Sequence, residues 1–161
     1  MGTCVGVIIV DETSGIGGLI HLLLPEPVNS QNVDHPEKYA VTGMPLFVER
    51  LIELGARPEN MCAVVAGGAL VGPLAPRDMN LDIGGRTVDT VMDVLRQKKI
   101  AVVASETGGF FTCTLELDMQ RWQWDIRPAG FDVPGTQPGK PSPTASDIAT
   151  AIESVRPIPQ V

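Results

Sequence analysis

The chain has 161 residues, of which 43% are apolar and 19% are charged, a composition typical of one globular domain with a sizeable core. Its net charge of −7 argues against a nucleic-acid partner, because an acidic surface repels phosphate backbones. The longest apolar runs, CVGVIIV and LIHLLLP, are too short to span a bilayer and no basic leader precedes them, so we expect a cytoplasmic protein without membrane insertion.

Two short apolar runs predict a pair of strands at the start of the chain. Residues 4–10, CVGVIIV, are rich in β-branched side chains and lead into turn residues at 11–18. The run from Gly18 to Leu24 predicts the next strand, which Pro25 ends. The two runs are close enough in sequence to form a hairpin.

The first helix is predicted from apolar spacing after a polar loop. Pro45 suits a first helical turn, where a missing N–H costs nothing. Phe47, Leu51 and Leu54 repeat at helical spacing, and Gly55 follows as the residue that ends the helix.

A strand and a second helix follow. Residues 61–66, MCAVVA, predict a buried strand, and residues 72–85 predict an irregular segment rich in Pro and Gly. Thr87 is expected to cap a helix that runs from Val88 to about Gln97.

Three further strands are predicted in the last third of the chain. KIAVVASE, at 99–106, predicts a strand, and the loosely alternating residues 111–117 predict another, with RWQWDIRP at 121–128 as its partner. Strands outnumber helices, and strands and helices do not alternate regularly. The sequence therefore predicts an α+β fold.

Beyond these strands, Pro, Gly and Ser dominate the chain. Residues 133–146 read as a flexible linker, followed by a short helix at about 147–155. We therefore predict a domain over residues 1–132 and a linker with a C-terminal tail over residues 133–161.

Cys4 and His21 are the candidate nucleophile and base. Pairing them directly in the hairpin leaves residues 11–14 as a four-residue loop, which is a common length. A register slip of two residues would still leave them diagonal neighbours on one face. A nearby imidazole can take the thiol proton, and the imidazolium can then protonate a leaving amine.

A structural interpretation of the same residues stays open. A free cysteine is among the most buried residue types, and a single histidine in an apolar strand is often a hydrogen-bonded core residue. Cys62 and Cys113 lie in predicted strands and are expected to be structural. An odd number of widely spaced cysteines with only two histidines predicts neither a disulfide framework nor a metal site.

Three glycine doublets punctuate the chain, namely Gly67-Gly68, Gly84-Gly85 and Gly108-Gly109. They could line a groove where a substrate's main chain approaches the protein, and their N–H groups could stabilise an oxyanion. They could equally be tight turns. None of them belongs to a phosphate-binding motif.

An ordered series of motifs resembles the CheD family, the chemoreceptor glutamine deamidases of bacterial and archaeal chemotaxis. The series covers roughly residues 1–127 and reads GTCVGVIIVD, GGLIHLLLP, KYAVTGMPLFVERLIELGA, VVAGGA, DIGGR and ETGG. Its most specific part combines the Gly-Thr-Cys-Val start, a histidine seventeen residues after that cysteine, and the Lys-Tyr-Ala helix entry.

The resemblance implies a layered β-sandwich with flanking helices and hydrolysis of receptor glutamine side chains to glutamate. Cys4 would be the nucleophile and His21 its base, with no cofactor. Thr3 matches the small hydroxyl residue before the cysteine. We assign it to substrate binding together with Gly67, Gly68, Gly108 and Gly109. The implied partners are methyl-accepting chemoreceptors and a phosphatase of the chemotaxis pathway.

Two departures from the family pattern leave alternatives open. The family's third catalytic residue is a threonine six residues before the cysteine, a position ahead of Met1, and Phe110 and Phe111 stand where the family tends to carry basic and polar residues. One alternative is a catalytically impaired binding module that regulates a chemoreceptor or a phosphatase. Another is a cysteine amidase or peptidase with a different substrate.

Overall fold

A computed structural model describes residues 1–27, 34–70 and 82–128. These residues form six strands and two α-helices, with short 3-10 turns at Pro36–Lys38 and Pro58–Asn60. In chain order the elements are β1 (Val5–Asp11), β2 (Ile16–Leu22), α1 (Ala40–Glu53), β3 (Cys62–Gly67), α2 (Ile83–Gln97), β4 (Ala101–Thr107), β5 (Cys113–Asp118) and β6 (Gln123–Pro128).

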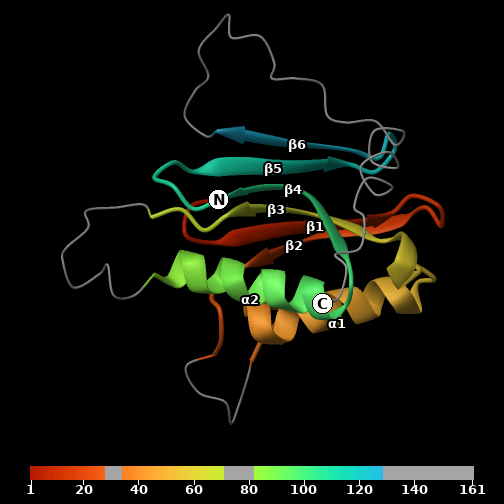
Figure 1. The fold of residues 1–161 in the computed structure, drawn as a ribbon, viewed down its shortest axis with the longest axis horizontal. Helices are drawn as coiled ribbons and strands as arrows, with labels where there is room; N and C mark the ends of the chain where they lie inside the picture. Colours follow the sequence, from red (N-terminus) through yellow and green to blue (C-terminus); the bar gives the residue numbers. More distant parts are fainter. Residues whose placement is uncertain (28–33, 71–81, 129–161) are drawn as a thin grey trace, which may run out of the picture.

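Four strands form the main sheet, in the order β2-β1-β3-β4. β1 is antiparallel to both of its neighbours, and β3 is parallel to β4. The helices α1 and α2 lie against one face of this sheet, and the separate β5–β6 hairpin lies on the other side (Figure 1). The prediction of a mixed fold of strands and helices is confirmed.

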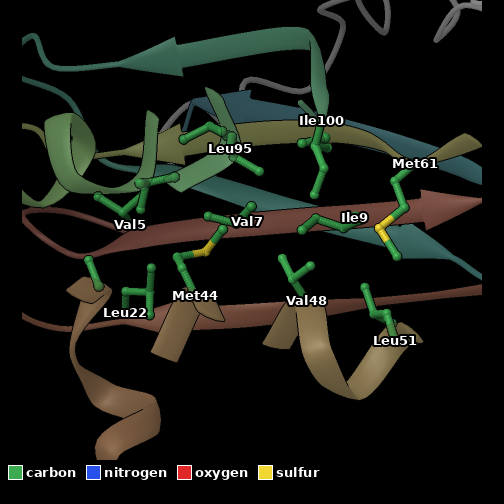
Figure 2. Close-up of a cluster of buried hydrophobic side chains, with 14 of the residues drawn as sticks. Val5, Val7, Ile9, Leu22, Met44, Val48, Leu51, Met61, Leu95 and Ile100 are labelled. Carbon is green, nitrogen blue, oxygen red and sulfur yellow. The ribbon is translucent and has the colours of Figure 1, made fainter. Parts of the chain in front are cut away.

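β1 is the centre of the core, and all seven of its residues are buried. Val5, Val7 and Ile9 face the helices, whereas Ile8 and Val10 face the β5–β6 hairpin. A strand with neighbours on both edges and apolar layers on both faces must be apolar throughout, which explains the unbroken VGVIIV run. Figure 2 shows the helix side, where β1 meets side chains from several elements, among them Leu22, Met44, Val48, Leu51, Met61, Leu95 and Ile100.

The helix start predicted from Pro45 was wrong, whereas the Lys-Tyr-Ala entry named with the family resemblance is confirmed. α1 begins at Ala40, so Pro45 is its sixth residue and lies inside it. The missing N–H of Pro45 would have paired with the carbonyl of Val41, a residue that is about half exposed to solvent. The predicted end is confirmed, because Gly55 has φ 109° and the N–H of Ala56 donates to the carbonyl of Leu51 at 3.0 Å.

The predicted start of the second helix was also wrong. α2 begins at Ile83, and the side chain of Asp82 caps it by accepting from the N–H of Gly85 at 2.8 Å. Thr87 is a buried residue inside the helix, and its hydroxyl donates to the carbonyl of Ile83 at 2.6 Å. The glycines at 84 and 85 therefore open a helix instead of forming a turn.

The strand predictions from residue 61 onward are confirmed by β3, β4 and the β5–β6 pair. Most of the segment 72–85 that was predicted to be irregular lies outside the described residues. The predicted linker at 133–146, the short helix at 147–155 and the domain boundary at 132 also lie outside them. These stay predictions.

Asp11 is a buried carboxylate that fixes the end of the first hairpin. Its side chain accepts hydrogen bonds from the N–H of Arg57 at 2.9 Å and the N–H of Ser14 at 3.2 Å. Burial alone would raise the pKa of Asp11, but these hydrogen bonds outweigh it and hold the pKa below its ordinary value of 3.8. The ionised carboxylate thus joins the hairpin loop to the segment that follows α1.

Asp11→Asn should lower the free energy of unfolding by about 1–3 kcal/mol near neutral pH, because it removes a charged acceptor from two backbone donors. A lowered folded-state pKa contributes stability above the unfolded pKa, and this contribution disappears as the pH falls through the folded pKa. Urea titrations at about pH 7 and about pH 3 should therefore show the difference shrinking at low pH. Asp89→Asn, at an exposed position in α2, is the matched control and should change little.

Candidate active site

Cys4 and His21 share one face of the sheet at one end of the first hairpin. β1 and β2 pair Gly6 with His21, so the predicted direct opposition of Cys4 and His21 was wrong by two residues. Cys4 precedes β1 and continues its alternation, because its carbonyl accepts from the N–H of Gly68 at 3.0 Å. Cys4 therefore projects to the same side as Gly6 and is a diagonal neighbour of His21.

The chemistry of the turn explains the shift in register. The structure pairs Asp11 with Ile16 and leaves residues 12–15 as the four-residue loop. The side chain of Asp11 accepts from the N–H of Ser14, and Gly15 takes the left-handed conformation with φ 68°. Asp11 is thus the last paired residue of β1 and not the first residue of the loop.

The two candidate side chains differ in exposure. His21 lies on the edge strand β2 and is exposed, so it is not a core residue. Cys4 is half-buried and free of any disulfide. Within the described ranges no hydrogen bond joins the Cys4 thiol to the His21 imidazole. Catalytic hydrogen bonds are often long without substrate and tighten in the Michaelis complex.

The topology brings this end of the sheet together. β2, β3 and β4 all run opposite to β1, so their last residues meet at the first residues of β1. This places His21, Gly67 and Gly108 around the segment that carries Cys4. Figure 1 shows the N-terminus beside the connection between β4 and β5.

Gly67 and Gly68 hold the main chain of Cys4. A Cβ atom at Gly67 would overlap the Cys4 carbonyl oxygen, and Gly67 has φ 115°. Gly68 packs on the start of α2, because a Cβ at Gly84 would lie 2.5 Å from the Gly68 carbonyl oxygen. Only glycine permits these approaches, so Gly67, Gly68 and Gly84 allow close backbone packing next to the segment that carries Cys4.

Gly108 and Gly109 extend the same backbone network. The N–H of Gly108 donates to the carbonyl of Gly67 at 2.9 Å, and the N–H of Leu70 donates to the carbonyl of Gly109 at 2.9 Å. Both glycines have positive φ, but in contrast to Gly67, a Cβ atom at either position would meet no other atom within 4 Å. They form the turn that leads out of β4.

These bonds decide which amides are available to a substrate. The N–H groups of Gly68 and Gly108 already donate to main-chain carbonyls, so neither is an open donor in this structure. The N–H of Cys4 donates to no backbone carbonyl among the described residues. Thr3, next to it, is exposed.

The residue Met1 completes the surroundings of Cys4. The N–H of Cys113 donates to the carbonyl of Met1 at 2.8 Å, and the Met1 amino group donates back to the carbonyl of Cys113. The Met1 side chain lies over Gly6, where a Cβ would overlap its sulfur. Sequence reasoning missed this contact, since no local pattern indicates that Met1 pairs with the start of β5.

The other two cysteines have the properties of structural thiols. Cys62 is buried, and burial, followed by the nearby carboxylates of Glu12 and Asp11, raises its pKa to about 11. Burial also raises the pKa of Cys113, although the N-terminal amino group acts in the opposite direction. Both groups therefore favour the protonated thiol near neutral pH.

Among residues 1–27, 34–70 and 82–128, no group of three or more His, Cys, Asp or Glu side chains is placed to hold a metal ion, and no helix is long and apolar enough to cross a membrane. A shallow pocket of about 250 Å3 lies between the segment after β2 and the two helices, and neither Cys4 nor His21 lines it. It is lined by Pro25, Glu26, Val41, Arg86, Asp89 and Thr90.

Comparison with known proteins identifies the family. The family model described as CheD chemotactic sensory transduction matches residues 23–128, which begin just after His21. The chain is 35% identical to the probable chemoreceptor glutamine deamidase CheD of Desulforamulus reducens over 130 residues, covering 81% of this chain and 78% of that protein. It is 32% identical to the protein of the same name from Clostridium tetani over 130 residues, covering 81% and 79%. This chain belongs to the CheD family.

Gly67→Ala should displace Cys4, because the new methyl group would overlap the Cys4 carbonyl. Gly108→Ala is the matched control, since φ is also positive there but no atom lies near the new methyl group. Backbone strain alone costs about 1–2 kcal/mol, so Gly67→Ala should destabilise the protein more than Gly108→Ala does. Equal losses in urea titrations of the two variants would refute the close approach.

The rate of alkylation should distinguish Cys62 from Cys4. Near pH 8 the buried Cys62, with a pKa of about 11, should react most slowly with iodoacetamide, and half-buried Cys4 should react faster. Peptide mass spectrometry of the partly alkylated protein measures the order. Faster modification of Cys62 than of Cys4 in the folded protein would contradict the placement of these thiols.

Proposed function

We propose that this protein is a protein-glutamine deamidase that converts glutamine side chains of chemoreceptors to glutamate, with Cys4 as nucleophile and His21 as base. The observation that carries the proposal is the placement of Cys4 and His21 as diagonal neighbours on one face, at the end of the sheet where three strands terminate. The names of the similar proteins, probable chemoreceptor glutamine deamidases, supply the substrate.

The first half of the reaction forms a thioester. The Cys4 sulfur attacks the side-chain amide carbon of the glutamine while the His21 imidazole takes the thiol proton. The tetrahedral intermediate collapses, the carbon–nitrogen bond breaks, and His21 gives the proton to the nitrogen, which leaves as ammonia. The exposure of His21 suits a base that must reach both the thiol and a glutamine carried by another protein.

The second half returns the enzyme to its starting state. Water attacks the thioester carbonyl while His21 takes one of its protons, and the carbon–sulfur bond then breaks. The thiolate recovers the proton from His21, and the product is a glutamate side chain. The two halves together consume water and release ammonia, so the reaction needs neither a redox partner nor a cofactor.

The main chain around Cys4 supports this role. Its carbonyl is tied to Gly68 and closely packed against Gly67, which fixes the backbone from which the thiol projects. The Cys4 N–H is the donor nearest the attacking sulfur along the chain, and we assign to it a hydrogen bond to the developing oxyanion. Thr3, exposed beside Cys4, would contact the bound substrate.

Three finer predictions accompany this proposal. The helix layer, the four-stranded sheet and the β5–β6 hairpin would form the layered sandwich implied by the family resemblance. The protein would act in the cytoplasm, where the signalling parts of chemoreceptors are accessible. A phosphatase of the chemotaxis pathway would be a second partner, in addition to the receptors.

Incubation with purified cytoplasmic fragments of chemoreceptors from the same organism tests the function. Peptide mass spectrometry should find glutamine converted to glutamate at defined positions. Cys4→Ala and His21→Ala should each reduce the rate by at least about a hundredfold, since general acid–base catalysis alone contributes about that much. Cys62→Ala, provided that it folds, is the matched cysteine control and should keep the activity.

The outcomes separate the candidate functions. Activity that persists in both Cys4→Ala and His21→Ala would reject the assigned pair. A folded protein that binds receptor fragments without converting any glutamine would instead be a binding module.

A further inference from the structure

Phe110 and Phe111, called here the aromatic tip, are the most exposed large apolar side chains of the described residues. Their exposed fractions are 66% and 71%. Two adjacent exposed phenylalanines leave a large apolar area in contact with water. Large exposed apolar areas often mark surfaces that bind another molecule.

The aromatic tip is held beside Cys4 by backbone hydrogen bonds on both sides. Before it, the Gly109 carbonyl accepts from the N–H of Leu70, and the Gly108 N–H donates to the carbonyl of Gly67, where a Cβ atom would overlap the Cys4 carbonyl. After it, Cys113 pairs with Met1, three residues before Cys4. The tip is therefore tied to the same segments that position the candidate nucleophile.

A second apolar pair flanks the candidate base. Side chains alternate between faces along β2, so Leu19 projects to the same side as His21, and Leu23, the residue directly after the strand, continues this alternation. Their exposed fractions are 43% and 39%, while Leu22, between His21 and Leu23, is buried against the helices. An exposed leucine thus lies on each side of the imidazole along the strand.

We propose that the aromatic tip, with Leu19 and Leu23, selects a protein segment in which apolar side chains flank the target glutamine. This inference rests on the proposed deamidase function and names the feature of the substrate that the site recognises. The two pairs come from different elements and border the two candidate catalytic residues, so a bound glutamine would bring its neighbours against them. Residues 101–120 contain no Lys or Arg, so this part of the rim offers apolar contact and no basic group.

The test measures deamidation kinetics and binding separately. The double variant Phe110→Ser/Phe111→Ser is compared with Ile52→Ser/Leu54→Ser, which removes two exposed apolar side chains at the other end of the molecule, by the tip of the first hairpin. The substrates are a chemoreceptor cytoplasmic fragment and two synthetic peptides, with either leucines or serines beside the glutamine. Binding of the fragment is measured in a Cys4→Ala background, where no reaction occurs.

The tip variant should raise KM for the fragment and for the leucine peptide by about tenfold or more, with kcat nearly unchanged, since burial of a phenylalanine is worth at least one such factor. KM for the serine peptide should change little, and the control variant should behave as wild type. Kd for the fragment should rise in parallel with KM.

Unchanged KM and Kd in the tip variant would overturn the inference while leaving the deamidase function intact. A tip variant that only abolishes self-association, seen by analytical ultracentrifugation, would also overturn it, because the occupant would then be a second copy of the chain. If wild type converts no glutamine, the proposed function fails, and the binding measurement still decides whether the tip contacts the receptor fragment.

Discussion

The contact between the Cys4 carbonyl and the Gly67-Gly68 corner is the constraint on which the site depends. Gly67 approaches the carbonyl so closely that any side chain there would collide with it, and Gly68 donates a hydrogen bond to it. This contact extends the β1–β3 pairing one residue beyond β1, so Cys4 keeps the alternation of the strand. The direction of the thiol, and hence its place on the His21 face, follows from it.

The main sheet has a buried centre that stabilises the fold and one end that carries the candidate site. β1 is buried along its whole length and provides a rigid centre between two apolar layers. Because β2, β3 and β4 all run opposite to β1, three chain segments end where β1 begins. Residues that are distant in sequence, such as His21, Gly67 and Gly108, thus meet around Cys4 without any long loop having to carry them there.

At the end of the sheet near Cys4, most glycines allow close packing of main-chain segments, and fewer of them form turns. Gly84 allows the first turn of α2 to pack against the carbonyl of Gly68, and the N–H of Gly68 donates to the carbonyl of Cys4. The helix therefore supports the backbone at Cys4, the candidate nucleophile, through contacts at Gly84 and Gly68. The N–H groups of Gly68 and Gly108 already take part in this network, so hydrogen-bond donors for a substrate must come from other groups. The exposed side chains around the candidate site are largely apolar.

Much of this fold could be predicted from local patterns, and the failures have physical causes. The buried strands were found because continuous β-branched runs are a strong signal, and Gly55 marked a helix end correctly. Pro45 led to a wrong start for α1, because it was placed in the first turn. A proline is tolerated inside this helix because the carbonyl of Val41, which loses its N–H partner, lies near solvent. Gly84 and Gly85 led to a wrong start for α2, because they were interpreted as a turn. Position 84 must be glycine because it contacts Gly68, and no local pattern reveals that contact.

The candidate site was predictable in its members but not in its geometry. The spacing of Cys4 and His21 suggested a hairpin pair, and the two-residue slip kept them on one face, since side-chain direction in a strand repeats every second residue. The hydrogen bonds of Asp11 with Ser14 set the register. They could be predicted only from the geometry of the turn, which the sequence does not reveal. The pairing of Met1 with Cys113 spans the whole domain, so it was beyond any local argument.

Trapping the covalent intermediate tests the central claim most directly. The protein is mixed with a chemoreceptor cytoplasmic fragment, quenched in acid during turnover, and digested for peptide mass spectrometry. We predict a hydroxylamine-sensitive thioester that joins the peptide containing Cys4 to a receptor glutamine peptide with the loss of ammonia. Deamidation that proceeds without such an adduct, or with an adduct only on Cys62 or Cys113, would contradict the account.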